Sequence, residues 1–186
     1  MSSKETILNA IRGLNQAEKH LPESPDFRLE GPLESLFIKA LEGNKAEVLN
    51  REEFQEWLSK CGMERIFSTV PTFQNQTNLI LPNDPHELED LELAILEGQF
   101  GVAENGAIWL EDAQLPHRAL PFITEHLVIV LQKENLVDTM HQAYDRIGGQ
   151  YSGFGLFVAG PSKTADIEQS LVIGAHGAKS LRVVLT

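Results

Sequence analysis

Cysteine is nearly absent from this sequence. A single cysteine, Cys61, occurs among 186 residues, so no disulfide framework can form, and the chain alone cannot supply four thiolates to an iron–sulfur cluster. Cys61 follows Phe54 and Leu58 at helical spacing, which places it on the apolar stripe of a predicted helix. We therefore interpret Cys61 as an inert core thiol.

Basic residues and long apolar runs are also scarce. The chain has 15 Lys and Arg against 27 Asp and Glu, a formal net charge of -12, which disfavours an extended nucleic-acid or anionic-membrane surface. No uninterrupted apolar run approaches the roughly 18 residues of a membrane-spanning helix, and the first residues lack a secretory signal pattern. We predict a cytoplasmic protein with neither a nucleic-acid nor a membrane partner.

Motifs for common cofactors and metals are missing too. No glycine-rich dinucleotide fingerprint follows the first predicted strand, and no nucleotide-triphosphate phosphate loop occurs. The chain has no His-Glu-x-x-His pair, cysteine pair or calcium loop, so we expect no metal and no cofactor in this chain. Oxidation of a substrate would then need an electron acceptor on another protein.

The sequence does contain the pattern of an α/β domain preceded by a helical arm. Ser2 and Glu5 form a capping box for a helix predicted to run to about His20, and prolines mark residues 21–32 as an arm. We predict further helices near 33–42, 51–61 and 136–147, and strands near 47–49, 65–70, 91–96, 107–111, 127–131, 154–159 and 181–185. Helices alternating with short apolar strands indicate an open, mostly parallel sheet with helices on both faces. We therefore divide the chain into an N-terminal helix and arm, 1–32, and an α/β domain, 33–186.

A predicted strand-to-helix turn follows the strand 154–159. Gly160 and Pro161 end the strand, and the spacing of Ile167 and Leu171 predicts a helix after it. The turn would thus place the free N–H groups of a first helical turn beside the end of a buried strand.

Polar side chains gather in this turn. Ser162 and Thr164 can cap the predicted helix, and its free N–H groups together with Lys163 would form an anion seat. Asp166 and Glu168 fall in the predicted first turn, where acidic residues favour the helix dipole. Lys163 with Asp166 could also orient a hydroxy-acid or phosphate group.

Two sequence blocks resemble a known family. The first comprises 100–106, the strand 107–110, Leu120, Pro121, His126 and the strand 127–131, and the second comprises 160–171, Gly174, His176, Gly177 and Leu181. Together they resemble the lactate-utilisation (LUD) domain family, most of all its lactate utilisation protein C group. The resemblance implies the open α/β sheet shared by sugar-phosphate isomerases, deaminases and CoA-transferases.

The resemblance also implies a function. It suggests an accessory subunit that supports oxidation of L-lactate to pyruvate beside iron–sulfur partner proteins, with a small anion-binding cleft. Iron–sulfur clusters are then expected only on the partners. Homo-oligomerisation stays open.

We expect the two blocks to share a cleft, because ligands of open parallel sheets bind beyond the carboxyl ends of the strands and both blocks follow predicted strands. The ligand-binding candidates are Asn105, Gly106, Gly160, Ser162, Lys163, Thr164, Asp166, Glu168, His176 and Gly177. His176, in a glycine-flanked turn, could act as acid, base or anion donor. We expect His126, at the head of a strand, to hydrogen-bond the backbone.

Glu104 is the one catalytic candidate. It lies between a strand and a tight turn, where a carboxylate could act as nucleophile or general base. Residues 103–106 look like the Ser-Glu-Asn-Gly signature of CoA-transferases, with Ala103 in place of the serine. The carboxylate could instead satisfy backbone donors at the turn. The alternatives to an accessory subunit are an independent CoA-transferase-like or sugar-phosphate enzyme using Glu104, and a non-catalytic ligand sensor.

Overall fold

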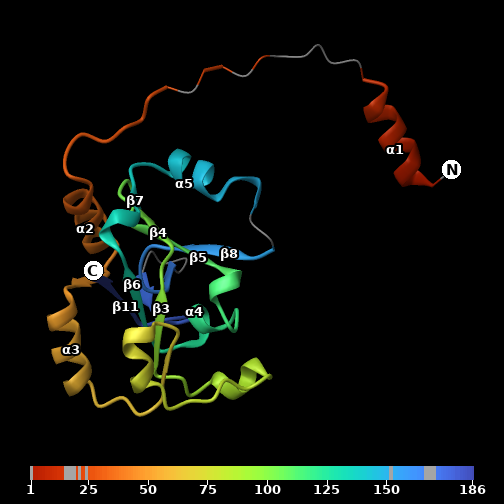
Figure 1. Ribbon diagram of the computed structural model, residues 1–186. Helices are drawn as coiled ribbons and strands as arrows, with labels where there is room; N and C mark the ends of the chain where they lie inside the picture. Colours follow the sequence, from red (N-terminus) through yellow and green to blue (C-terminus); the bar gives the residue numbers. More distant parts are fainter. Residues whose placement is uncertain (1, 15–19, 21, 24, 151–152, 166–170) are drawn as a thin grey trace.

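The N-terminal helix stands apart from the sheets in the computed structural model, which describes all residues except 1, 15–19, 21, 24, 151–152 and 166–170 (Figure 1). Helix α1 (Ser3–Arg12) begins with the predicted capping box, in which the Glu5 N–H donates to Ser2 Oγ and the Ser2 N–H to the Glu5 carboxylate. It ends at Arg12, well before the predicted end near His20, and Gly13 is its C-cap. None of its side chains is buried.

Five parallel strands form the central sheet in the described part of the chain. They are β1 (Glu47–Leu49), β2 (Ile66–Ser68), β3 (Leu93–Glu97), β6 (His126–Leu131) and β11 (Ser180–Leu185). Their spatial order is β1-β11-β6-β3-β2, and every pairing is parallel. β3 and β6 are almost wholly apolar because both faces of the sheet are covered. The predicted mostly parallel sheet is confirmed.

Helices cover both faces of the central sheet, as predicted. On one face lie α3 (Arg51–Lys60) and the 3-10 helix η1 (Pro71–Gln76). Phe54 of α3 and Phe73 of η1 meet edge to face with ring centroids 5.0 Å apart, and both pack on apolar side chains of β3, β6 and β11. On the opposite face, α2 (Leu33–Gly43) buries Phe37 and Leu41.

A second sheet shares the α2 face, and the sequence did not predict it. Its strands are β7 (Leu136–Val137), β4 (Phe100–Val102), β5 (Ala107–Glu111) and β8 (Gly155–Val158), in that spatial order. β5 pairs antiparallel with β4 and β8, whereas β4 and β7 are parallel. The strands predicted at 107–111 and 154–159 therefore belong to this sheet and not to the central one. Ile108 and Leu110 join the same core cluster as Leu96 and Ile129 of the central sheet.

Helix α5 (Met140–Ile147) covers the outer face of the second sheet through Ala143. It begins later than the predicted residue 136, because Leu136 and Val137 pair with Gly101 and Val102 of β4. Figure 1 shows α5 on the far side of β4 and β5 from the central sheet.

The residues after Gly160 form strands where a helix was predicted. β9 (Lys163–Ala165) pairs antiparallel with β10 (Leu171–Ile173), with Thr164 opposite Val172. The helix prediction is therefore wrong for these residues, while residues 166–170 lie outside the described part. The Gly174 N–H donates to the Ser162 carbonyl at 2.9 Å, and such pairing between distant residues overrides the helical spacing of a few apolar residues.

The remaining elements are short. They are α4 (Leu120–Ile123) and the 3-10 helices η2 (Pro85–Leu88), η3 (Asp112–Gln114), η4 (Lys133–Asn135) and η5 (Gly148–Gln150). Within the described ranges, no helix has the length and apolar character needed to cross a bilayer.

Candidate ligand site

Four of the predicted site residues line one pocket of about 230 Å³. They are Gly160, Ser162, His176 and Gly177. The other walls are apolar and consist of Pro121, Phe122, Leu127, Leu156, Phe157, Val158, Ala159 and Ala178. The pocket thus lies between the β8 edge of the second sheet and the segments that lead into β6 and β11. We call it the β8 pocket.

The β8 pocket lies at the amino ends of central strands, whereas the expected cleft was at their carboxyl ends. Leu127 is the second residue of β6, and Ala178 lies two residues before the start of β11. The expectation rested on the rule for parallel sheets. It is wrong for the Gly160 turn because β8 belongs to the separate sheet, where it pairs antiparallel with β5.

Ser162 is held in place by its backbone. Its N–H donates to the Ala178 carbonyl at 2.9 Å, and its carbonyl accepts the Gly174 N–H at 2.9 Å. A Cβ added at Gly177 would lie 3.1 Å from Ser162 Cβ and 3.4 Å from its Oγ, so glycine at 177 leaves room for the Ser162 side chain. Backbone hydrogen bonds therefore hold Ser162 in place, and its hydroxyl takes no part in them.

Two further polar side chains lie near Ser162 and Gly160, and one of them lines the pocket. His176 is exposed beside Ser162. The Lys163 side chain is exposed and passes over Gly160, since its Nζ lies 3.4 Å from where a Gly160 Cβ would be. Ser162 and His176 thus line the pocket, whereas Lys163 does not line it and approaches Gly160 on the side of Asn44. Thr164 is half-buried in β9 and does not line the pocket; Asp166 and Glu168 lie outside the described residues.

Glu104 is placed elsewhere. It is exposed in the turn between β4 and β5, its N–H donates to the Asp138 carbonyl at 2.9 Å, and its carboxylate accepts the Met140 N–H at 2.8 Å. Met140 is the first residue of α5, so the carboxylate accepts a hydrogen bond from an N–H group that has no partner within the helix. Glu104 does not line the β8 pocket.

Asn105 and Gly106 complete the β4–β5 turn. Asn105 Oδ1 accepts the Ala107 N–H at 3.0 Å. Gly106 has φ of 73°, and a Cβ there would lie 2.9 Å from the backbone nitrogen of Leu41. Both residues therefore serve the geometry of a turn packed against the end of α2.

Asn44 joins the two sequence blocks, and the sequence alone indicated only that it ends a helix. Its Nδ2 donates to the Asn105 carbonyl at 2.7 Å. Its own carbonyl lies 2.6 Å from where a Gly160 Cβ would be. Asn44 thus lies between the turn that holds Glu104 and the turn that begins at Gly160.

His126 lies outside the β8 pocket and contacts a side chain, where backbone contact was expected. Its Nδ1 is 2.7 Å from Ser180 Oγ, and its Nε2 is 4.0 Å from Glu125 Oε1. Arg182 donates to the same Ser180 oxygen at 3.1 Å. Burial lowers the pKa of His126, although Glu125 opposes that effect.

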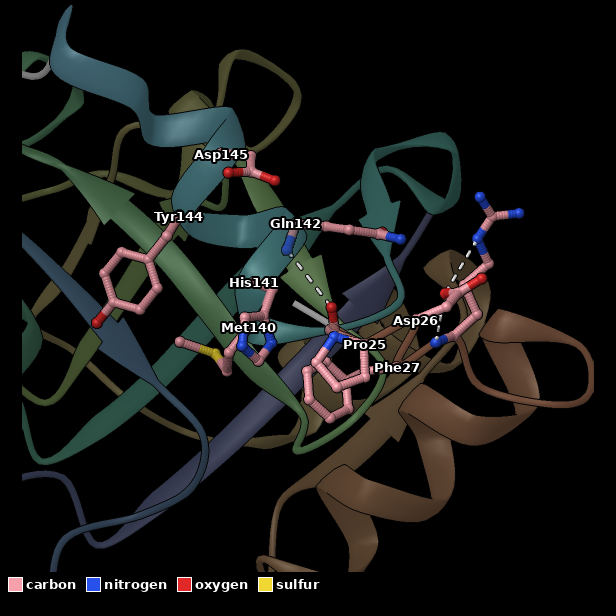
Figure 2. Close-up of a pocket in the computed structure, with 10 residues that line it drawn as sticks. Pro25, Asp26, Phe27, Met140, His141, Gln142, Tyr144 and Asp145 are labelled. Carbon is pink, nitrogen blue, oxygen red and sulfur yellow. Dashed lines mark hydrogen bonds and ion pairs between the residues drawn. The ribbon is translucent and has the colours of Figure 1, made fainter. Parts of the chain in front are cut away.

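A larger cleft of about 640 Å³ separates the arm from α5, and Figure 2 shows the side chains that line it. Phe27 of the arm stacks on His141 of α5 with ring centroids 4.7 Å apart. Tyr144 and Asp145 project from the same helix. The sequence indicated none of these residues, because the stacking joins parts of the chain that have no common motif.

No group of three or more His, Cys, Asp or Glu side chains able to hold a metal ion occurs among the residues that the structure describes. The lowered pKa values of Asp84, Glu92 and Asp112 have local causes. The leading contributions are hydrogen bonds from the His86 backbone, the Arg65 backbone and the Arg118 side chain, respectively. These carboxylates are structural ion-pair and turn groups.

The fold defines an α/β domain with a parallel central sheet and a smaller mixed sheet on one face. Residues 38–186 match the LUD domain family, and the chain belongs to that family. A crystal structure of a DUF162 family protein from Deinococcus radiodurans has a similar fold, with a TM-score of 0.60 and 16% identity, covering 82% of this chain and 95% of that one.

Named relatives match over part of the chain. Identity to lactate utilization protein C of Bacillus pumilus is 34% over 95 residues, which are 48% of this chain and 40% of that protein. Identity to lactate utilization protein C of Shouchella clausii is 30% over 117 residues, 60% of this chain and 51% of that protein. The chain thus spans about half the length of the curated relatives it matches.

Proposed function

We propose that this chain is a cytoplasmic accessory subunit that supports oxidation of L-lactate to pyruvate with iron–sulfur partner proteins. The names of the two relatives support a role in lactate utilisation. One cysteine cannot supply the four thiolates of a cluster, so the clusters are assigned to the partners and no cofactor to this chain. On this proposal residues 1–32 form an N-terminal helix and a proline-containing arm, and residues 33–186 form the LUD-type α/β domain.

The ligand-binding part of the proposal is carried by the β8 pocket. It brings Gly160, Ser162, His176 and Gly177 together, and the Lys163 ammonium group lies close to Gly160. Hydroxyl, imidazole and ammonium groups all donate hydrogen bonds to anions. A small carboxylate is therefore the ligand that this opening favours, although the predicted helix N-terminus does not form there.

Growth on lactate tests this function. A host strain lacking the gene is complemented with the wild type or with Ser162→Ala/Lys163→Ala. Ser162 is anchored through its backbone and Lys163 is exposed, so the double variant should fold. We expect the wild type to restore growth on L-lactate and the double variant to restore it at least about tenfold more slowly, as the loss of charge-assisted hydrogen bonds implies.

A matched Ser-Lys pair provides the control. Ser59 and Lys60 are exposed neighbours at the end of α3, and Ser59→Ala/Lys60→Ala should complement like the wild type. Equal growth of both double variants on lactate would contradict the assigned anion site. Full growth of the gene-deleted strain on lactate would contradict the role in lactate utilisation.

A further inference from the structure

The edges formed by β2, β1 and β7 are each protected against pairing with another chain. At the β2 edge, Asn78 Oδ1 accepts the Ile66 N–H at 2.9 Å, and the Asn78 N–H donates to the Ile66 carbonyl at 3.1 Å. Thr77 Oγ1 accepts the Ser68 N–H at 2.9 Å on the same side. The β1 edge carries the charged Glu47, and β7 has only two residues. Side-chain cover, charge and short length all discourage pairing at an edge.

The edge formed by β8 lacks such cover among the residues that the structure describes. The Asp112 N–H donates to the Phe154 carbonyl at 2.9 Å, which makes these two residues a hydrogen-bonded pair of the β5–β8 ladder. Because such pairs alternate in antiparallel ladders, Gly155 and Phe157 direct their N–H and C=O groups away from β5. The carbonyl of Trp109, the residue opposite Phe157, accordingly accepts a bond from the residue that precedes β4, at 3.0 Å. The β8 edge therefore presents backbone donors and acceptors in extended conformation.

The surroundings of this edge are apolar and uncharged. Residues 147–162 contain no charged side chain, although the whole chain has a formal net charge of -12. An exposed aromatic residue flanks the edge on each face of the sheet. Phe122, 50% exposed, lines the β8 pocket with Phe157, and Tyr144, 64% exposed, meets the Phe157 ring at a centroid distance of 6.0 Å. Exposed aromatic side chains around a depletion of charge are typical of protein interfaces.

A second copy of this chain fits the edge in both charge and geometry. Two acidic chains repel each other, and the repulsion is least where both surfaces carry no charge. The edge is also complementary to itself, because antiparallel pairing about a two-fold axis can place Phe157 opposite Phe157 of the second copy. Both residues direct their backbone groups outward, so they can exchange two N–H···O bonds. The same surface on both copies then forms the interface, as in most symmetric dimers.

We propose that β8 pairs antiparallel with β8 of a second copy, so that the two second sheets join into one continuous sheet. The contact lies beside the β8 pocket, since Leu156, Phe157 and Val158 also line that pocket. A four-residue strand gives a small interface, so the dimer is weak and depends on protein concentration. This inference goes beyond the proposed function and does not depend on the anion site.

Sedimentation of the full chain over a series of concentrations tests the dimer. The mass of the wild type should rise from one copy toward two as concentration increases. Phe122→Glu places a negative charge beside the paired strands in both copies, so it should raise the dissociation constant at least about tenfold. Ile80 is 92% exposed and lies two residues after Asn78 of the covered β2 edge. Ile80→Glu should therefore dimerise like the wild type, and circular dichroism would verify the fold of both variants.

Amide hydrogen exchange, measured by NMR on the wild type, locates the interface without a substitution. The Phe157 amide should exchange more slowly at concentrations where the dimer forms, whereas the Leu156 and Val158 amides, which already bond to β5, should change less. A monomer at every concentration would overturn the second copy as the occupant of this edge. A dimer with unchanged exchange at Phe157, or equal dissociation constants for Phe122→Glu and Ile80→Glu, would show that the copies meet elsewhere.

Discussion

Burial of the His126 imidazole predicts that stability depends on pH in the mildly acidic range. Its pKa is lowered by burial from an ordinary value of 6.5. The unfolded chain therefore takes up a proton near that pH while the folded chain resists it. Because the unfolded state then binds more protons, the free energy of unfolding falls as pH drops below about 6.5. The lowered pKa values of Glu92 and Asp112 act at lower pH.

Replacing His126 should flatten this dependence. We expect the wild type to lose stability between about pH 7.5 and about pH 5.5, and His126→Gln to lose less over the same interval. Urea unfolding at the two pH values measures both losses. His20→Gln removes an exposed imidazole and serves as the control. Equal losses in the wild type and His126→Gln would show that this imidazole does not cause the dependence.

Glu104 shows how one carboxylate can match a catalytic signature and still have a structural contact. Its bond to the Met140 N–H places a negative charge at the start of α5. Such charges stabilise a helix by about 0.3–1 kcal/mol when exposed. This contact corresponds to the second interpretation of the sequence, in which the carboxylate satisfies a backbone donor.

At the scale of elements, the β4–β5 hairpin depends on a close approach to α2. Gly106 combines φ of 73° with a Cβ position 2.9 Å from the Leu41 backbone nitrogen. We expect Gly106→Ala to lower the free energy of unfolding by at least about 1–2 kcal/mol, because a left-handed backbone alone has that cost for other residues. Urea denaturation measures the change.

Gly43, the last residue of α2, supplies the control. An added Cβ at Gly43 has nothing within 4 Å, and alanine favours a helix over glycine by up to about 1 kcal/mol. Gly43→Ala should therefore be as stable as the wild type or more so. If Gly106→Ala matched it, the close packing of the hairpin on α2 would not be limiting.

The elements set by local chemistry were predictable from the sequence. The capping box predicted at Ser2 forms, because it depends on residues three apart. The apolar runs of β3 and β6 identified strands buried on both faces. The same kind of run did not reveal that β5 and β8 lie in a second sheet, since an apolar strand does not encode its partner.

The sequence predicted some of the residues that meet at the site but not their arrangement. Gly160, Ser162 and His176 do meet, as their common block suggested. The expected helix seat and the shared cleft with Glu104 depended on long-range pairing: β9 pairs with β10, and the Glu104 carboxylate reaches α5. The contact through Asn44 carries no sequence signal, because asparagine after a helix is ordinary.

At the scale of the whole molecule, the two sheets share one main hydrophobic core. The chain has a formal net charge of -12. The LUD domain accounts for residues 38–186. Since the chain spans only about half the length of the lactate utilization proteins it matches, its place among partner proteins must be tested on the chain itself.

Affinity purification of the tagged chain from its own host grown on lactate, followed by mass spectrometry and iron analysis, tests the central claim most directly. The account predicts that cysteine-rich iron–sulfur proteins co-elute with the chain and carry the iron. Elution of the chain alone, or equal recovery of the same partners with an unrelated tagged protein, would contradict the role of an accessory subunit.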